Sequence, residues 1–164
     1  MKGSGILQAL LTMDVVSVVS LLAVVWALDN PGGAGQDPMA RHIAWGLGAA
    51  LMNLIARCIA IFYFLAGGRA LKDLVAEEGL DPSFVLRSKR LKRPVETVAT
   101  LALIPVMVAA IGGGGIHATE DAGHHAFWAW SSVVMAVSCL AVDARNGVRH
   151  HRLLREADEA LAKE

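Results

Sequence analysis

The chain has 164 residues, no net formal charge at neutral pH, and a composition that is 55% hydrophobic but only 18% charged. Soluble domains carry about 25% charged residues, so the composition argues against a soluble globular domain and favours a membrane protein. The length allows one domain. The two cysteines, Cys58 and Cys139, lie in apolar segments without a CxxC motif, so neither a redox nor a zinc motif is indicated.

The first apolar segment, 5–28, is long enough to cross a bilayer, which takes about 20 mostly apolar residues. Lys2 ahead of it resembles the start of a signal peptide. The apolar run is longer than the apolar region of a signal peptide and contains Asp14, so we predict a retained membrane helix. The following segment, 29–40, contains Pro31 and Pro38 and is predicted to be a loop.

Three further apolar segments follow along the chain: 42–66, 94–111 and 124–143. Pro94 suits the first turn of the third helix, and the glycine run 112–115 is interpreted as its stop. Thr119, followed by two acidic residues, is predicted to be the N-cap of the fourth helix. The fold class is therefore predicted to be all-α: a polytopic four-helix transmembrane bundle with up-down-up-down topology, forming a single membrane domain over 1–164.

Lysine and arginine gather in two segments, the connection 67–93 and the C-terminal tail 146–164. Because cytoplasmic loops carry an excess of these residues, the connection and both termini are predicted to be cytoplasmic. The protein is predicted to be a multi-pass protein of the bacterial inner (cytoplasmic) membrane. Gly79 is expected to end a helical extension of the second span, and Asp81 is expected to cap a short helix that follows.

The basic residues of this short helix are predicted to contact anionic lipid. They are Arg87, Lys89, Arg90, Lys92 and Arg93. The alternative is a solvated charged loop that only fixes the topology. The tail is expected to be a solvated helical extension on which His150 and His151 are exposed. Its basic and acidic residues are balanced, which argues against nucleic-acid binding.

Asp14 and Arg57 are ionisable residues inside predicted spans, and such residues are candidates for function. Each lies about nine residues from the cytoplasmic end of its span, a depth of roughly 14 Å. We predict a charge pair, either a proton-relay or ligand-anchoring site or a structural pair that holds two helices in register. Asn53 lies one turn from Arg57 on the same face. Asp143 is a competitor for the pairing with Arg57, but it is expected near the inner interface. A polar stripe of the fourth span is predicted to face the interior: His124, Ser131, Ser138 and Asn146.

Histidines and acids gather at the opposite, outer ends of the spans. The candidate ligands are His42, His117, Asp121, His124 and His125. Imidazole and carboxylate groups bind transition metals, and two histidines on different helices can hold haem b. His42 with His117 or His124 is the first pairing expected for haem. The alternative interpretation is that these are ordinary polar residues near the lipid headgroups.

Three functions are compatible with this pattern. The first is a small integral membrane accessory or subunit protein, within a homo-oligomer or a larger membrane complex. The second is a redox or electron-transfer accessory protein carrying haem b or a transition metal at the outer rim. The third is a small proton-coupled transport module using Asp14 and Arg57. No nucleophile elbow, HExxH motif or paired catalytic carboxylates are present, so an enzyme is not favoured.

Overall fold

The structure, a computed structural model, describes residues 4–29, 38–119 and 122–162, and within these the side chains of 5–26, 40–112 and 123–162. The described residues form four helices joined by short connections. Their bounds are α1 (Ser4–Asp29), α2 (Pro38–Glu77), α3 (Ser83–Thr119) and α4 (Ala122–Leu161). The prediction of an all-helical protein with four long apolar helices is thereby confirmed.

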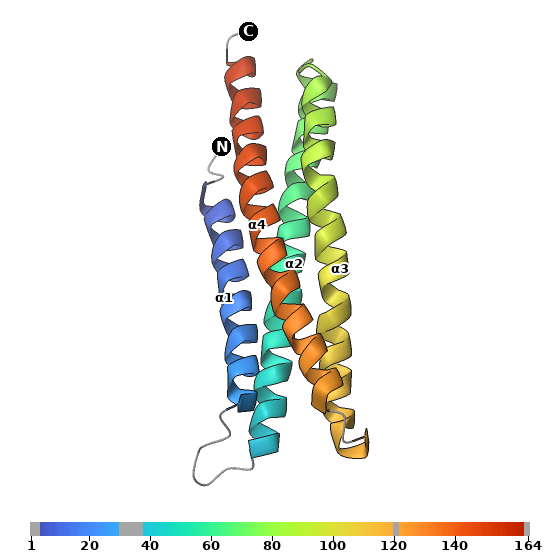
Figure 1. The fold of residues 1–164 in the computed structure, drawn as a ribbon. Coiled ribbons are helices and arrows are strands. Elements are labelled where there is room, and N and C mark those ends of the chain that lie inside the picture. Colours follow the sequence, from blue (N-terminus) through green and yellow to red (C-terminus); the bar gives the residue numbers. More distant parts are fainter. Residues whose placement is uncertain (1–3, 30–37, 120–121, 163–164) are drawn as a thin grey trace.

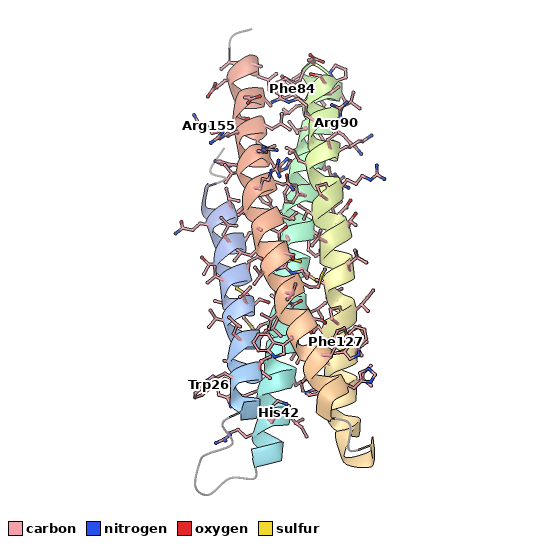
Figure 2. The ribbon with its side chains drawn as sticks, in the orientation of Figure 1. Trp26, His42, Phe84, Arg90, Phe127 and Arg155 are labelled. Atoms are coloured by element: carbon pink, nitrogen blue, oxygen red, sulfur yellow. The ribbon has the colours of Figure 1, made fainter. Side chains whose placement is uncertain are left out.

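The helices form an elongated bundle in which successive helices run in opposite directions (Figure 1). Helices α1 and α3 each pack against both α2 and α4, and α2 also touches α4 across the bundle. We call the end that carries Trp26, His42 and Phe127 the outer end, and the end that carries Phe84, Arg90 and Arg155 the inner end (Figure 2).

Away from the inner end, the outward-facing surface of the bundle is largely apolar, and its interior contains polar side chains. Ile111, Phe62 and Val134 are 74%, 68% and 61% exposed, whereas Asp14 and Arg57 are 0% and 1% exposed. Each helix is long and apolar enough to cross a membrane. A soluble protein has the opposite distribution. This distribution is compatible with a multi-pass membrane protein in which lipid covers the exposed side chains.

Helix α3 begins at Ser83 and runs without a break through Pro94 and Pro105. The prediction that a short helix and a separate third span meet at Pro94 is wrong. The start is determined by Asp81, whose carboxylate accepts a hydrogen bond from the Ser83 amide at 2.8 Å. This bond lowers the pKa of the Asp81 carboxyl because it favours the charged form. Proline inside the helix is tolerated because membrane helices satisfy the freed backbone groups by local adjustment.

Two further boundary predictions have different outcomes. The prediction of a helix stop at the glycine run is wrong, because α3 continues to Thr119, and Thr119 therefore does not cap α4. The prediction that Gly79 ends the extension of α2 is confirmed. Gly79 adopts a φ of 72°, and the Leu80 amide after it returns to the Leu74 carbonyl at 3.4 Å. Glycine adopts this left-handed conformation at little cost.

The apolar core is divided along the bundle axis. The outer cluster contains Leu21, Val25, Ala49, Ala129, Val133 and Ala136. The middle cluster contains Leu10, Ala60, Tyr63, Phe64 and Val95. The inner cluster contains Leu71, Leu80, Leu153, Leu154 and Ala157, so it packs the end of α4 against the α2–α3 hairpin. Between the outer and middle clusters lies a layer of polar side chains.

Candidate functional site

A charge cluster of three side chains lies at the centre of the polar layer. Arg57 of α2 donates from Nη2 to Asp14 Oδ1 of α1, and from Nη1 to Asp143 Oδ2 of α4 at 2.8 Å. All three residues are at most 1% exposed. We refer to Asp14, Arg57 and Asp143 as the charge cluster.

The structure brings Asp14 and Arg57 together and adds a third member that was expected elsewhere. Asp143 was expected near the inner interface, but the structure shows it buried inside the bundle and in contact with Arg57. Its carboxylate accepts from Nη1 of the same guanidinium whose Nη2 donates to Asp14. The expected two-residue pair is in fact a cluster of two acids and one base.

The charges of the cluster do not cancel when both acids are ionised. An arginine side chain stays protonated in proteins, so the fully ionised cluster carries one excess negative charge in a site closed to solvent. One proton shared by the carboxyl groups brings the net charge to zero. In addition, Asp14 Oδ2 accepts no hydrogen bond from the described residues. The arrangement can therefore hold one proton that its carboxyl groups bind and release.

A second buried polar pair lies one helical turn from the charge cluster, toward the outer end. Asn53 Nδ2 donates to Ser17 Oγ at 3.0 Å, and both residues are fully buried. Asn53 is on the same face of α2 as Arg57, as the spacing of four residues predicts. The pair extends the polar layer from the charge cluster toward the outer cavity described next.

The outer cavity lies between the helices at the outer end and has a volume of about 170 Å³. His42 and His125 line it together with mostly apolar side chains, including Leu21, Ala49 and Val106, and with the buried Ser132. The two imidazole rings meet edge to face with their centroids 5.9 Å apart. The lining of the cavity is thus mostly apolar, with His42, His125 and Ser132 as its polar residues.

The histidines of the outer rim are not all in this cavity. The ring beside His42 is that of His125, whereas His124 stacks on Trp128 with ring centroids 6.3 Å apart. The side chain of His117 and the whole of Asp121 lie outside the described residues. Among the side chains that the structure does describe, no group of three or more histidine, cysteine or carboxylate residues is arranged to hold a metal ion.

His150 is buried, and the prediction that it is exposed on a solvated tail is wrong. Its ring is 0% exposed, stacks on Phe64 at 4.9 Å and meets Tyr63 edge-on at 5.5 Å, measured between centroids. Neither ring nitrogen has a hydrogen-bond partner among the described residues. The tail continues α4 as part of the bundle, and His150 lies two turns from Asp143 on the same helix face.

The buried face of α4 follows a heptad-like pattern with alternating steps of three and four residues. Its members are Ala136, Cys139, Asp143, Asn146, His150, Leu153 and Ala157. The predicted stripe shares only Asn146 with it. Ser131 and Ser138 instead donate to carbonyl groups of their own helix, those of Phe127 and Val134, both at 2.8 Å. The spacing of Asp143, Asn146 and His150 is the signal in the sequence that would have found this face.

Close packing around His150 gives a prediction for Gly67. A Cβ atom at Gly67 would collide with His150 Nε2 and lie 3.2 Å from Cε1, and the ring cannot move away easily because it stacks on Phe64. We expect Gly67→Ala to destabilise the protein by about 1–3 kcal/mol, measured by thermal unfolding in detergent.

Gly48→Ala on the same helix is the matched control for this substitution. A Cβ at Gly48 meets nothing within 4 Å, so the change is expected to be neutral or to stabilise the protein by about 0.5–1 kcal/mol. Adding His150→Ala to Gly67→Ala should relieve the collision. Equal effects of Gly67→Ala and Gly48→Ala would contradict the close packing described for His150.

The fold and the site define a class: a four-helix protein compatible with multi-pass insertion, with a buried cluster of two carboxyl groups and one guanidinium in its core. No family model matches this chain, and no curated protein or solved structure is significantly similar to it.

Proposed function

We propose that this protein is a small proton-coupled membrane transport module in which the charge cluster is the proton-binding site. The observation that carries the proposal is the two-to-one ratio of acids to base in a fully buried site. Asp14 and Asp143 share the guanidinium of Arg57, and all three are closed to solvent.

An excess charge in the bundle core is energetically costly. A buried ion pair pays a large desolvation penalty that only good geometry and hydrogen bonding offset. An additional unpaired carboxylate has no such compensation, and its neutral form is favoured in low dielectric. The two acids therefore titrate as a coupled pair, and binding of one proton switches the cluster between net charges of minus one and zero.

A route for the proton is supported by the order of polar groups along the bundle. From the outer end, the order is His42 and His125, then Ser132, then Ser17 and Asn53, then the charge cluster. On the inner side, Asn146 and His150 follow Asp143 on the buried face of α4. Polar residues inside a membrane bundle mark proton and substrate pathways. In this proposal, the outer cavity gives access to the cluster from one side and His150 from the other.

The orientation in this proposal follows from the charges and aromatic residues at the two ends. The basic residues of α2, α3 and α4 gather at the inner end, so this end faces the cytoplasm. Trp26, Trp45 and Trp130 are 67%, 62% and 52% exposed, as expected for an interfacial aromatic belt. One bundle encloses only a small cavity, so a substrate pathway is expected to form between copies of the protein or with a partner subunit.

The proposal is tested by measuring a protonated carboxylic acid in the purified protein. Infrared difference spectra recorded across a pH titration should show the carbonyl band of a neutral carboxylic acid that disappears as the pH rises. The same protein in proteoliposomes with an internal pH dye should accelerate proton entry under an imposed gradient. Absence of the acid band at every pH would mean that the cluster binds no exchangeable proton, and would overturn the proposal.

A transition-metal site at the outer cavity is the second candidate function. The contact between His42 and His125 favours it, because neutral imidazole is a common ligand for zinc, copper, iron and nickel. The cavity of about 170 Å³ suits one ion better than haem, since pockets for larger organic ligands are roughly 300–1,000 Å³.

We expect the purified protein to bind Zn²⁺ or Ni²⁺ measurably, and His42→Ala or His125→Ala to weaken binding by about 100-fold or more. Even the loss of a group that only orients a ligand costs about 10–100-fold in metal affinity. Isothermal titration with each ion checks this, and His151→Ala is the matched control at the inner end. Unchanged affinity in both outer variants would contradict a site at the cavity, and a Soret band in the purified protein would favour haem instead.

A further inference from the structure

A groove rich in arginine lies between α3 and α4 near the inner end of the bundle. Arg87 and Arg90 of α3 and Arg149 and Arg152 of α4 line it, with Leu91, Leu153 and Glu156 completing its wall. We call it the arginine groove; its volume is about 370 Å³. Figure 2 shows Arg90 on α3 at this end of the bundle, and Arg155 on the side of α4 that faces away from α3.

The arginine groove has an excess of positive charge. Arg87 donates to Glu156 at 2.7 Å, and this pair is about half exposed. The other three arginines form no ion pair with a carboxylate among the described residues. Like charges from two helices thus converge on one groove, which costs energy unless an anion binds there. Arginine binds phosphate through two parallel N–H donors, and several arginines around one groove favour this ligand.

The position of the arginine groove along the bundle axis indicates the source of the phosphate that it binds. A Cβ at Gly147 of α4 would lie 2.8 Å from Leu7, and His151 lies beside Leu7 and Gln8 in a shallow cleft. These residues belong to the first turns of α1, where its apolar span begins. Arg149 and Arg152 are therefore level with the end of an apolar span, the depth of lipid headgroups.

Farther toward the outer end, α3 and α4 expose apolar side chains. Leu101 of α3 and Val134 and Val137 of α4 are 49%, 61% and 47% exposed. A lipid with its headgroup phosphate in the arginine groove could lay its acyl chains over this surface. A soluble phosphate would gain nothing from it. The apolar surface therefore favours a lipid over free phosphate as the occupant.

We infer that the arginine groove binds the phosphate of an anionic membrane lipid from the leaflet at the inner end. Only some of the basic residues in 87–93, which were all expected to contact anionic lipid, belong to this site. Arg87 and Arg90 face the arginine groove with α4, whereas Lys89 and Lys92 line a separate groove with Arg69 and Lys72 of α2. The site thus needs Arg149 and Arg152, which lie far from this run in the sequence.

The test measures lipid retention by native mass spectrometry of the full chain in a neutral detergent. Phosphatidylglycerol, phosphatidylcholine and inorganic phosphate are added in separate experiments. We expect the wild-type chain to retain phosphatidylglycerol in preference to phosphatidylcholine. Arg149→Gln with Arg152→Gln should weaken this retention roughly 30-fold, because each basic residue near an anionic surface contributes about a factor of five. Arg149→Lys with Arg152→Lys keeps the charge but loses the paired N–H donors, so its lipid retention should lie between those of wild type and the glutamine variant.

The matched control is Arg69→Gln with Lys72→Gln, which removes the same charge from exposed positions of α2 that line the separate groove. This control should retain the lipid within about twofold of wild type, and its folding shows that the loss of two positive charges at the inner end is tolerated. Equal loss in both double variants would overturn a specific site and leave general surface charge. Displacement of the lipid by inorganic phosphate at comparable concentration would overturn the lipid as the occupant. Equal retention of phosphatidylcholine would also overturn the inference.

Discussion

Replacement of Arg57 with glutamine is expected to remove about 3–5 kcal/mol from the stability of the bundle, because it leaves buried carboxyl groups without their shared cation. This is a large part of the total stability of a small protein, about 5–15 kcal/mol. The measurements are the yield of monodisperse protein in size-exclusion chromatography and the thermal unfolding midpoint in detergent. Both should fall sharply relative to wild type.

Rescue variants separate this electrostatic cause from a simple loss of volume. Adding Asp14→Asn and Asp143→Asn to Arg57→Gln removes every charge from the cluster while keeping similar side-chain sizes. The triple variant should regain most of the lost stability, since coupled residues do not contribute additively. Arg57→Gln with wild-type stability would show that both acids stay neutral without arginine, and the charge balance described here would be wrong.

Replacement of Asp143 with asparagine is expected to abolish proton binding by the cluster while the fold is kept. The variant retains one carboxylate, Asp14, and one guanidinium, Arg57, so the remaining pair is neutral without any proton. The carboxylic-acid band and the pH-dependent proton uptake should therefore be lost, with only a modest change in stability. Infrared titration, proton flux in proteoliposomes and thermal unfolding give the three measurements on the same preparation.

Asp14→Asn is the companion to this variant, and we expect the same outcome because the two acids contribute equally to the charge balance. Ser138→Ala is a matched control on α4, since its hydroxyl binds the backbone of its own helix. It should leave the acid band and the proton flux unchanged. A cluster that only holds the helices in register predicts a different result: each Asp→Asn variant would lose stability, and wild type would show no exchangeable proton to begin with.

These two predictions together separate a proton-binding site from a structural ion pair. A structural pair makes arginine and the acids similarly important for stability and gives none of them a role in proton uptake. The proposed site makes Arg57 essential for folding and each acid essential for proton binding but not for folding. The difference arises from stoichiometry, because two acids share one base.

The sequence by itself was sufficient for properties that depend on local composition and helical rise. The four long apolar helices follow from the length of the apolar runs. Gly79 ends α2 through its own left-handed backbone conformation, and Asp81 starts α3 by accepting a hydrogen bond from the nearby Ser83 amide. Both effects are local and can be predicted from sequence. The similar depth of Asp14 and Arg57 follows from counting residues along two helices, because the rise per residue is constant.

Proline and glycine residues led to wrong predictions of helix ends, because α3 tolerates these residues within a long apolar helix. Pro94 and the glycine run were expected to bound α3, yet the helix continues through both. Proline and glycine disfavour a helix in water, but inside a long apolar helix the alternative is an exposed backbone without hydrogen bonds. The energetic cost of a break there exceeds the cost of the unfavourable residue.

Only the tertiary structure decided which side chains form the site. Asp143 joins Arg57, His125 meets His42, and His150 is buried against Phe64. Each of these depends on which face of α4 points into the bundle. The sequence pattern contained two polar stripes on this helix, and a serine can satisfy its hydroxyl on its own helix whereas a carboxylate cannot. Burial of Asp143 is tolerated only where Arg57 can reach its carboxylate. The face of α4 that carries Asp143 therefore packs into the bundle, and this depends on how α4 is rotated against its neighbours.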